Sequence, residues 1–148
     1  DLSIIQDADC EYDPRDIENL IKFMEKNKFD VVYGSRILNK SNKYSYRTYL
    51  LGNLFLNKLT NILYKIKITD METCYKLMPT KIFKEIGIKS NGFDIEPEIT
   101  AKISSKGYKI GEFPISYYPR SKKEGKKIRW RDGLIALYVL LYWKFRSF

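Results

Sequence analysis

Two aspartates separated by a single residue are the first side chains in this sequence that could do chemistry. Asp7 and Asp9 follow a short β-rich run at residues 3–5. In α/β proteins ligands bind at the carboxyl ends of strands, so both carboxylates are expected at a ligand site. Mg²⁺ is typically held by one or two carboxylates plus substrate phosphates, and Glu11 could supply a third oxygen. The alternative is an Asp-x-Asp pair in a solvated turn.

The remaining metal-binding residue types narrow the choice of cation. The sequence has no histidine, and its two cysteines, Cys10 and Cys74, form no Cys-x-x-Cys pair. Zinc sites use several thiolates or imidazoles, so the predicted cofactor is Mg²⁺ or Mn²⁺. Such a cation would neutralise charge that builds on a leaving diphosphate. Two free thiols also fit a reducing compartment.

The charge of the chain favours anionic partners. Its 27 Lys and Arg residues outnumber 18 Asp and Glu residues, which gives a formal charge of +9. Residues 120–131 form a basic loop in which Glu124 is the only acid. The cations of this loop are Arg120, Lys122, Lys123, Lys126, Lys127, Arg129 and Arg131. Such a run binds phosphates or acidic head groups, or it is a solvated loop.

Strand and helix patterns alternate along the chain, which predicts one α/β domain over residues 1–148. Strands are expected at residues 30–33, 74–78 and 108–117, the last of them paired or bent at Pro114. Asp13-Pro14 predicts a helix start, and residues 79–86 a short helix closed by Gly87. A long helix should bury one apolar face. That face comprises Leu51, Leu54, Phe55, Leu59, Ile62 and Leu63.

The C-terminal segment 132–148 is predicted to be an apolar helix with basic flanks. Its longest apolar run, residues 134–143, is shorter than the roughly 20 residues that span a bilayer. The helix therefore lies at a membrane surface or packs on the sheet.

Two further acids, Asp70 and Glu96, are candidates for the same site, whereas a third, Glu98, is expected outside it. Asp70 precedes a polar turn and is expected to point into the cleft, or else to satisfy backbone donors of that turn. Glu96 lies in the first turn of the helix that Ile95 begins, where the helix dipole favours a carboxylate. Glu98 is expected on the solvent side of that helix, paired with Lys102 at i,i+4 spacing.

Several segments resemble glycosyltransferase family 2, above all its dolichol-phosphate mannosyltransferase and polyprenyl-phosphate glycosyltransferase branch. They are residues 6–9, 13–14, 32–36, 69–76, 92–102, 114–120, 124–128 and 130–133, in family order. The resemblance implies a GT-A-like mixed sheet flanked by helices. It also implies a nucleotide-binding half before the acidic motif. Nothing here corresponds to that half, so we expect a chain that lacks it.

The resemblance also implies roles for individual residues. Asp7 and Asp9 would hold the metal and the donor diphosphate, with Glu11 as a third ligand. Asp70 and Glu96 would be the catalytic carboxylates. The residues expected to bind donor or acceptor phosphate are Ser35, Arg36, Arg47, Arg120 and Lys126. For Arg36 the alternative is an ion pair with a surface acid.

The predicted reaction is inverting transfer of a sugar from a nucleotide-diphospho-sugar to a polyprenyl phosphate. A phosphate monoester has a second pKa near about 6, so this acceptor needs no strong base. A glycan hydroxyl, the alternative acceptor, would need a carboxylate base, with Asp70 or Glu96 as candidates. The predicted location is cytoplasmic, peripheral on a membrane. A non-catalytic basic module for nucleic acid or membranes would explain the charge but not the placed acids, so no nucleic-acid partner is expected.

Overall fold

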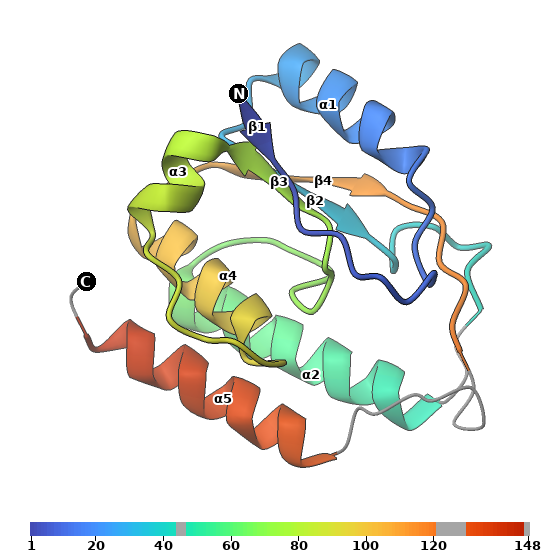
Figure 1. The fold of residues 1–148 in the computed structure, drawn as a ribbon. Coiled ribbons are helices and arrows are strands. Elements are labelled where there is room, and N and C mark those ends of the chain that lie inside the picture. Colours follow the sequence, from blue (N-terminus) through green and yellow to red (C-terminus); the bar gives the residue numbers. More distant parts are fainter. Residues whose placement is uncertain (44–46, 121–129, 147–148) are drawn as a thin grey trace.

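The protein was analysed as a computed structural model that describes residues 1–43, 47–120 and 130–146, with the side chains of residues 47 and 49 not described. Strands and helices alternate, as predicted (Figure 1). The strands are β1 (Leu2–Ser3), β2 (Val31–Ser35), β3 (Lys76–Pro79) and β4 (Ile110–Pro114). The helices are α1 (Asp16–Asn27), α2 (Arg47–Tyr64), α3 (Thr80–Glu85), α4 (Ile95–Ser105) and α5 (Trp130–Lys144).

Within the described residues the strands form one mixed sheet in the order β1-β3-β2-β4. The central strand β2 is parallel to β4 and antiparallel to β3, with Val32 opposite Gly111 and Leu77. All five residues of β2 are buried, which explains its unbroken run of small and apolar residues. The predicted α/β fold with a mixed sheet flanked by helices is confirmed.

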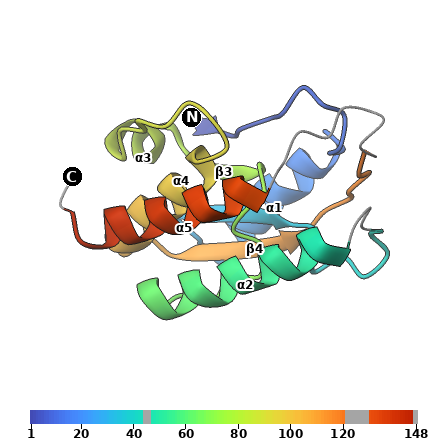
Figure 2. The ribbon, with the colours of Figure 1, turned by 90° about the horizontal axis from the view of Figure 1, so that it is seen from below.

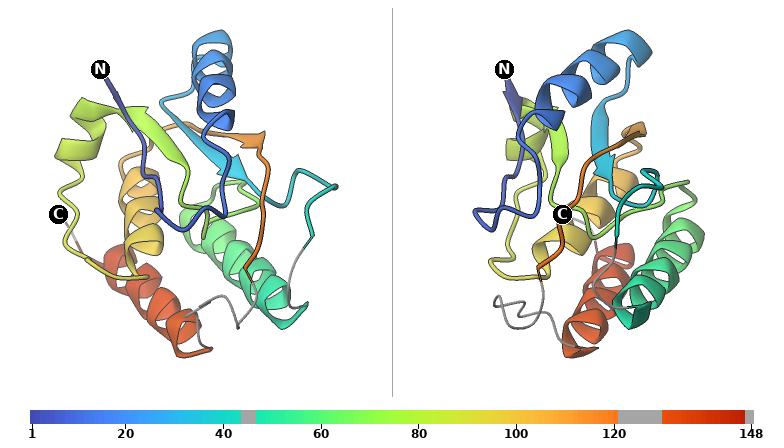
Figure 3. Two further views of the ribbon diagram at one scale, coloured as in Figure 1. Left: turned by 45° about the vertical axis from the view of Figure 1, so that its right-hand side comes forward. Right: turned by 90° about the vertical axis from the view of Figure 1, so that its right-hand side faces the viewer.

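Alternate residues of β2 pack into two separate cores, because successive side chains of a strand point to opposite faces. Val32 faces α1 and packs with Leu20 and Met24. Val31 and Tyr33 face the other layer, where α2, α4 and α5 lie together. Figures 1 and 3 show α1 on one side of the sheet and these three helices on the other.

The helix α2 differs from its prediction, because much of its apolar face lies in solvent. Leu51, Phe55 and Ile62 are 65%, 62% and 67% exposed. The inward side instead carries Asn57 and Asn61, whose amides bind the backbone of the segment before β3. Asn61 accepts from the Ile68 N–H at 2.9 Å and donates to the Ile68 carbonyl at 2.8 Å. These amides add to the contacts of the buried Leu56 and Tyr64 on the inward side of the helix.

Glu98 is also not on the solvent side: it is fully buried, and this expectation was wrong. The predicted i,i+4 pair with Lys102 is confirmed at 2.5 Å, and both side chains are inaccessible. Lys102 lies 4.0 Å from the ring centre of Trp143, because α5 packs over α4. Burial raises the pKa of Glu98, but hydrogen bonds from Lys102 and Ser90 outweigh this effect, so the pKa lies below its usual value.

The last helix, α5, packs with one face against the helices α4 and α2, and its other face is exposed. Contact with a membrane stays a prediction. Val139 and Leu140 pack against the neighbouring helices, whereas Trp130, Leu134 and Tyr138 are 72%, 56% and 64% exposed. Figure 2 shows α5 and α2 running along the same side of the molecule. Along the described chain, no helix has both the length and the hydropathy that crossing a bilayer requires.

Candidate active site

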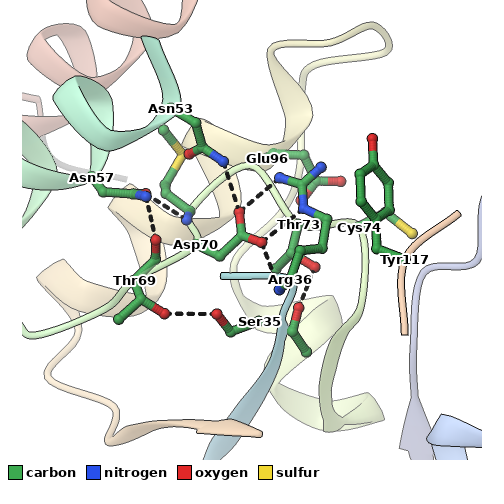
Figure 4. Close-up of polar contacts among 12 residues, drawn as sticks. Ser35, Arg36, Asn53, Asn57, Thr69, Asp70, Thr73, Cys74, Glu96 and Tyr117 are labelled. Atoms are coloured by element: carbon green, nitrogen blue, oxygen red, sulfur yellow. Dashed lines mark hydrogen bonds and ion pairs between the residues drawn. The ribbon is translucent and has the colours of Figure 1, made fainter. Parts of the chain in front are cut away.

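The centre of the site is a buried pair between Arg36, which directly follows β2, and Asp70, in the loop before β3 (Figure 4). The Arg36 guanidinium donates to both oxygens of Asp70 at 2.7 Å, and the Arg36 backbone N–H donates at 2.9 Å. Asn53 on α2 adds a fourth donor at 3.1 Å. Burial raises the pKa of Asp70, but Arg36 more than offsets it, so the carboxylate stays ionised. Asp70 therefore holds Arg36 in place.

Ser35 and the residues beside Asp70 fix the loop that carries this pair. Ser35 is fully buried, and its hydroxyl lies 2.7 Å from that of Thr69. Glu112 on β4 accepts from the backbone N–H groups of Thr69 and Asp70 at 2.8 and 3.0 Å. Ser35 was predicted to contact phosphate, whereas the structure places its hydroxyl inside the loop scaffold.

A second cluster joins the acidic motif to the segment that precedes the basic loop. Arg120 donates to Asp9 at 2.8 Å and to Glu11 at 3.3 Å, and the Arg120 backbone N–H also donates to Glu11 at 2.9 Å. The two segments run side by side, since the N–H of Tyr118 donates to the carbonyl of Glu11 at 2.8 Å. The structure thus brings Arg120 to Asp9 and Glu11, which lie far from it in the sequence.

Tyr117 connects the two clusters, a role that sequence reasoning missed. Its hydroxyl donates to Glu11 at 2.9 Å, and its ring centre lies 5.3 Å from the guanidinium carbon of Arg36. Burial, partly offset by Arg36, raises the pKa of Tyr117 well above its usual value, so it remains a neutral donor. Only its position beside Pro119 and Arg120 in a family-like segment could have drawn attention to it.

The contacts of Asp7, Asp9 and Glu11 indicate whether these acids could bind a metal ion. Burial and, to a smaller extent, the negative charge of the nearby Asp9 raise the pKa of Asp7. Among the described residues, no three acidic or thiol side chains converge as a ready metal cluster. Glu11 is engaged by Tyr117 and Arg120 instead. Two adjacent carboxylates still fit a cation that substrate phosphates complete, and the Arg120 guanidinium already shows that the cluster accepts positive charge.

Glu96 lies in the first turn of α4, as predicted, and forms an ion pair with Lys76 on β3. Lys76 is fully buried and also donates to the carbonyl of Met71 at 2.8 Å and to that of Thr73. Burial raises the pKa of Glu96, and Lys76 partly opposes this effect. Sequence reasoning missed Lys76, although a lysine at a buried strand position is a signal that an acid must lie opposite.

Two predicted phosphate ligands are not placed. Arg47 is the first residue of α2, but its side chain is outside the described part of the chain. Lys126 falls in residues 121–129, which also lie outside the described residues.

The structure thus places acids and arginines at the edge of an α/β sheet where strands end, which is where proteins of this fold class commonly bind their ligands. The family model described as Glycosyl transferase family 2 matches residues 1–87. This match covers more than half of the 148 residues, and the chain belongs to glycosyltransferase family 2.

Curated relatives are archaeal proteins of low identity. The low-salt glycan biosynthesis hexosyltransferase Agl6 of Haloferax volcanii is 25% identical over 81% of this chain and 30% of its own length. The glycosyltransferase AglJ of the same organism is 24% identical over 79% of this chain and 38% of its own length. The uncharacterized protein MJ1222 of Methanocaldococcus jannaschii is 27% identical over 97% of this chain. The chain spans 30–60% of the length of these relatives.

Proposed function

We propose that the full-length protein is an inverting glycosyltransferase that moves a hexose from a nucleotide-diphospho-sugar to a polyprenyl phosphate, on a GT-A-like fold. The choice of acceptor rests on one observation: Asp70 and Glu96 are each engaged in an ion pair with a cation. Both carboxylates that could have served as a base for a hydroxyl are held in ion pairs, with Arg36 and Lys76. An acceptor phosphate is already ionised near neutral pH, so it requires positive charge and orientation instead.

The reaction forms a bond between an acceptor phosphate oxygen and the anomeric carbon of the sugar. The bond from that carbon to the donor diphosphate breaks, and the diphosphate leaves with the electron pair. Asp7 and Asp9 would hold Mg²⁺ or Mn²⁺, which supplies charge neutralisation for the leaving diphosphate. Asp70 fixes the direction of the Arg36 guanidinium before any ligand arrives, so no reorganisation is needed during the reaction. Arg120 stands beside Asp9 as a second cation for phosphate.

A lipid acceptor is supported by exposed apolar side chains on α2 and α5, two helices that pack against each other. The exposed large side chains of these helices are Leu51, Leu54, Phe55, Ile62, Trp130, Leu134, Ile135, Tyr138 and Leu141. A groove along α2 reaches Thr69, the neighbour of Asp70. It is lined by Ile37, Leu54, Asn57, Lys58, Asn61, Ile62, Ile68 and Thr69. Exposed apolar patches of this kind mark interaction surfaces, and the exposed Arg131 and Lys144 suit acidic head groups. We propose peripheral docking on the cytoplasmic face of a membrane.

Sugar transfer by the full-length protein tests this function. UDP-glucose, UDP-N-acetylglucosamine and GDP-mannose, each radiolabelled, are offered with Mn²⁺ and either undecaprenyl phosphate in vesicles or soluble oligosaccharides. Label is expected in the lipid fraction, and Asp9→Asn should lower the rate by roughly 100-fold, as removal of one preorganised charge does. Glu25→Gln, an exposed acid on α1, is the matched control. Label only in the oligosaccharides would refute the acceptor, and full activity of Asp9→Asn with chelator present would refute the metal role.

A further inference from the structure

One acid near the site differs from its neighbours. Asp70 binds Arg36, Glu96 binds Lys76, and Glu112 accepts backbone N–H groups. The Oε1 atom of Glu72, in contrast, is buried and has no hydrogen-bond partner among the described residues. Buried polar atoms are nearly always paired, so an unpaired carboxyl oxygen at the edge of a site indicates that a ligand supplies the partner.

The backbone on both sides of Glu72 is fixed. The Lys76 ammonium donates to the carbonyls of Met71 and Thr73, the two residues that flank it. The Thr73 hydroxyl donates to the carbonyl of Gly34 on β2 at 2.6 Å. Glu72 therefore sits in a turn tied to the central strand, and its position is set by the same loop that positions Asp70.

The charges that face Glu72 come from every element around it. They are the cations Lys76 on β3 and Arg36 after β2, and the anions Glu96 on α4 and Asp70 in its own loop. Burial, the largest effect, raises the pKa of Glu72 to about 7. A substrate anion placed among these groups raises the pKa further, so the bound state favours the neutral acid.

We propose that Glu72 binds an oxygen of the acceptor phosphate as a neutral carboxylic acid and donates its O–H to that oxygen. The inference rests on the proposed lipid-phosphate acceptor and assigns the contact that recognises it. An ionised carboxylate would repel the phosphate, whereas a neutral acid supplies a hydrogen-bond donor at this buried position. A carboxyl group kept neutral by its surroundings is an established way to make such a donor.

Calorimetric titration of the full-length protein with farnesyl phosphate tests the proposal. Runs at about pH 7 in two buffers of different ionisation enthalpy give the protons taken up on binding. A group that is half protonated before binding and neutral afterwards takes up about half a proton, and Glu72→Gln should lower the uptake by that amount. Equal uptake by the wild type and Glu72→Gln, with binding intact, overturns the role of Glu72 and leaves the acceptor unaffected. Absence of binding by the wild type overturns the phosphate acceptor together with this role.

Transfer rates separate a donor from a base. Glutamine keeps a donor of the same shape, so Glu72→Gln should retain activity within about three-fold near pH 6, while Glu72→Ala should lose roughly ten-fold or more. The pH dependence due to Glu72 should disappear in Glu72→Gln. A loss of roughly 100-fold or more in Glu72→Gln, with unchanged unfolding, would instead identify a general base and contradict the proposal. Glu25→Gln, the exposed acid, should behave as the wild type in both experiments.

Discussion

The site contains two acid–arginine clusters that differ in burial. Arg36 and Asp70 have side chains 12% and 0% exposed and share two hydrogen bonds of 2.7 Å between them. Arg120 and Asp9 are 35% and 24% exposed and are joined at 2.8 Å. One pair is sealed in the loop scaffold, and the other is open to solvent.

The difference in burial indicates that the inner pair is fixed, whereas the outer pair can exchange its partners. A buried charge that loses its partner is strongly destabilising, so the Arg36–Asp70 pair is fixed. An exposed pair is screened by water and contributes little to stability. The Asp9–Arg120 pair can therefore open at low cost, which frees Asp9 to bind a cation and Arg120 to bind a phosphate. Under the proposed function, the inner pair would set the geometry of the site and the outer cluster would meet the ligand.

The largest expected effect is that of Asp70→Asn. It leaves Arg36 without its counter-ion at a buried position, and the free energy of unfolding should fall by about 3–5 kcal/mol. Urea unfolding of the full-length protein measures this, with Asp9→Asn as the matched change in the outer cluster. Asp9→Asn should lose far less stability while losing activity. Equal destabilisation by the two substitutions would show that the outer cluster is structural as well.

Glu72→Gln sharpens the comparison, because Glu72 is an acid with no arginine partner. Its pKa is about 7 in the folded protein against an ordinary value of 4.5. Between these values the folded state binds more protons than the unfolded state, so stability falls as pH rises from about 4.5 to 7. Glutamine removes this loss and should stabilise the protein by about 1–3 kcal/mol at pH 8, with little change near pH 4. Urea midpoints across this pH range measure the effect, and a uniform shift at all pH values would contradict it.

The sequence predicted most helices and strands, because apolar periodicity and turn residues are features of short segments of the chain. It placed Arg36 and Asp70 in one site and the acidic motif near Arg120. It could not show that Asp70 is sealed by Arg36 and Asn53, since that depends on how α2 docks. The exposed side of α2 was missed for the same reason. Asn57 and Asn61 hydrogen-bond the segment before β3, a contact that apolar periodicity cannot show, so the periodicity alone assigned these asparagines to the outer side.

The smallest expected effect is that of Tyr117→Phe, which probes whether the two clusters act separately. The substitution removes the hydroxyl that donates to Glu11 at 2.9 Å and keeps the ring beside Arg36. Glu11 retains its hydrogen bonds from Arg120, so the unfolding free energy should fall by only about 1 kcal/mol. Urea unfolding measures this, and Tyr118→Phe, at a 59% exposed neighbour, is the control. A loss as large as that of Asp70→Asn would mean that Tyr117 joins both clusters into one cooperative unit, because only then does breaking the outer contact also release Arg36.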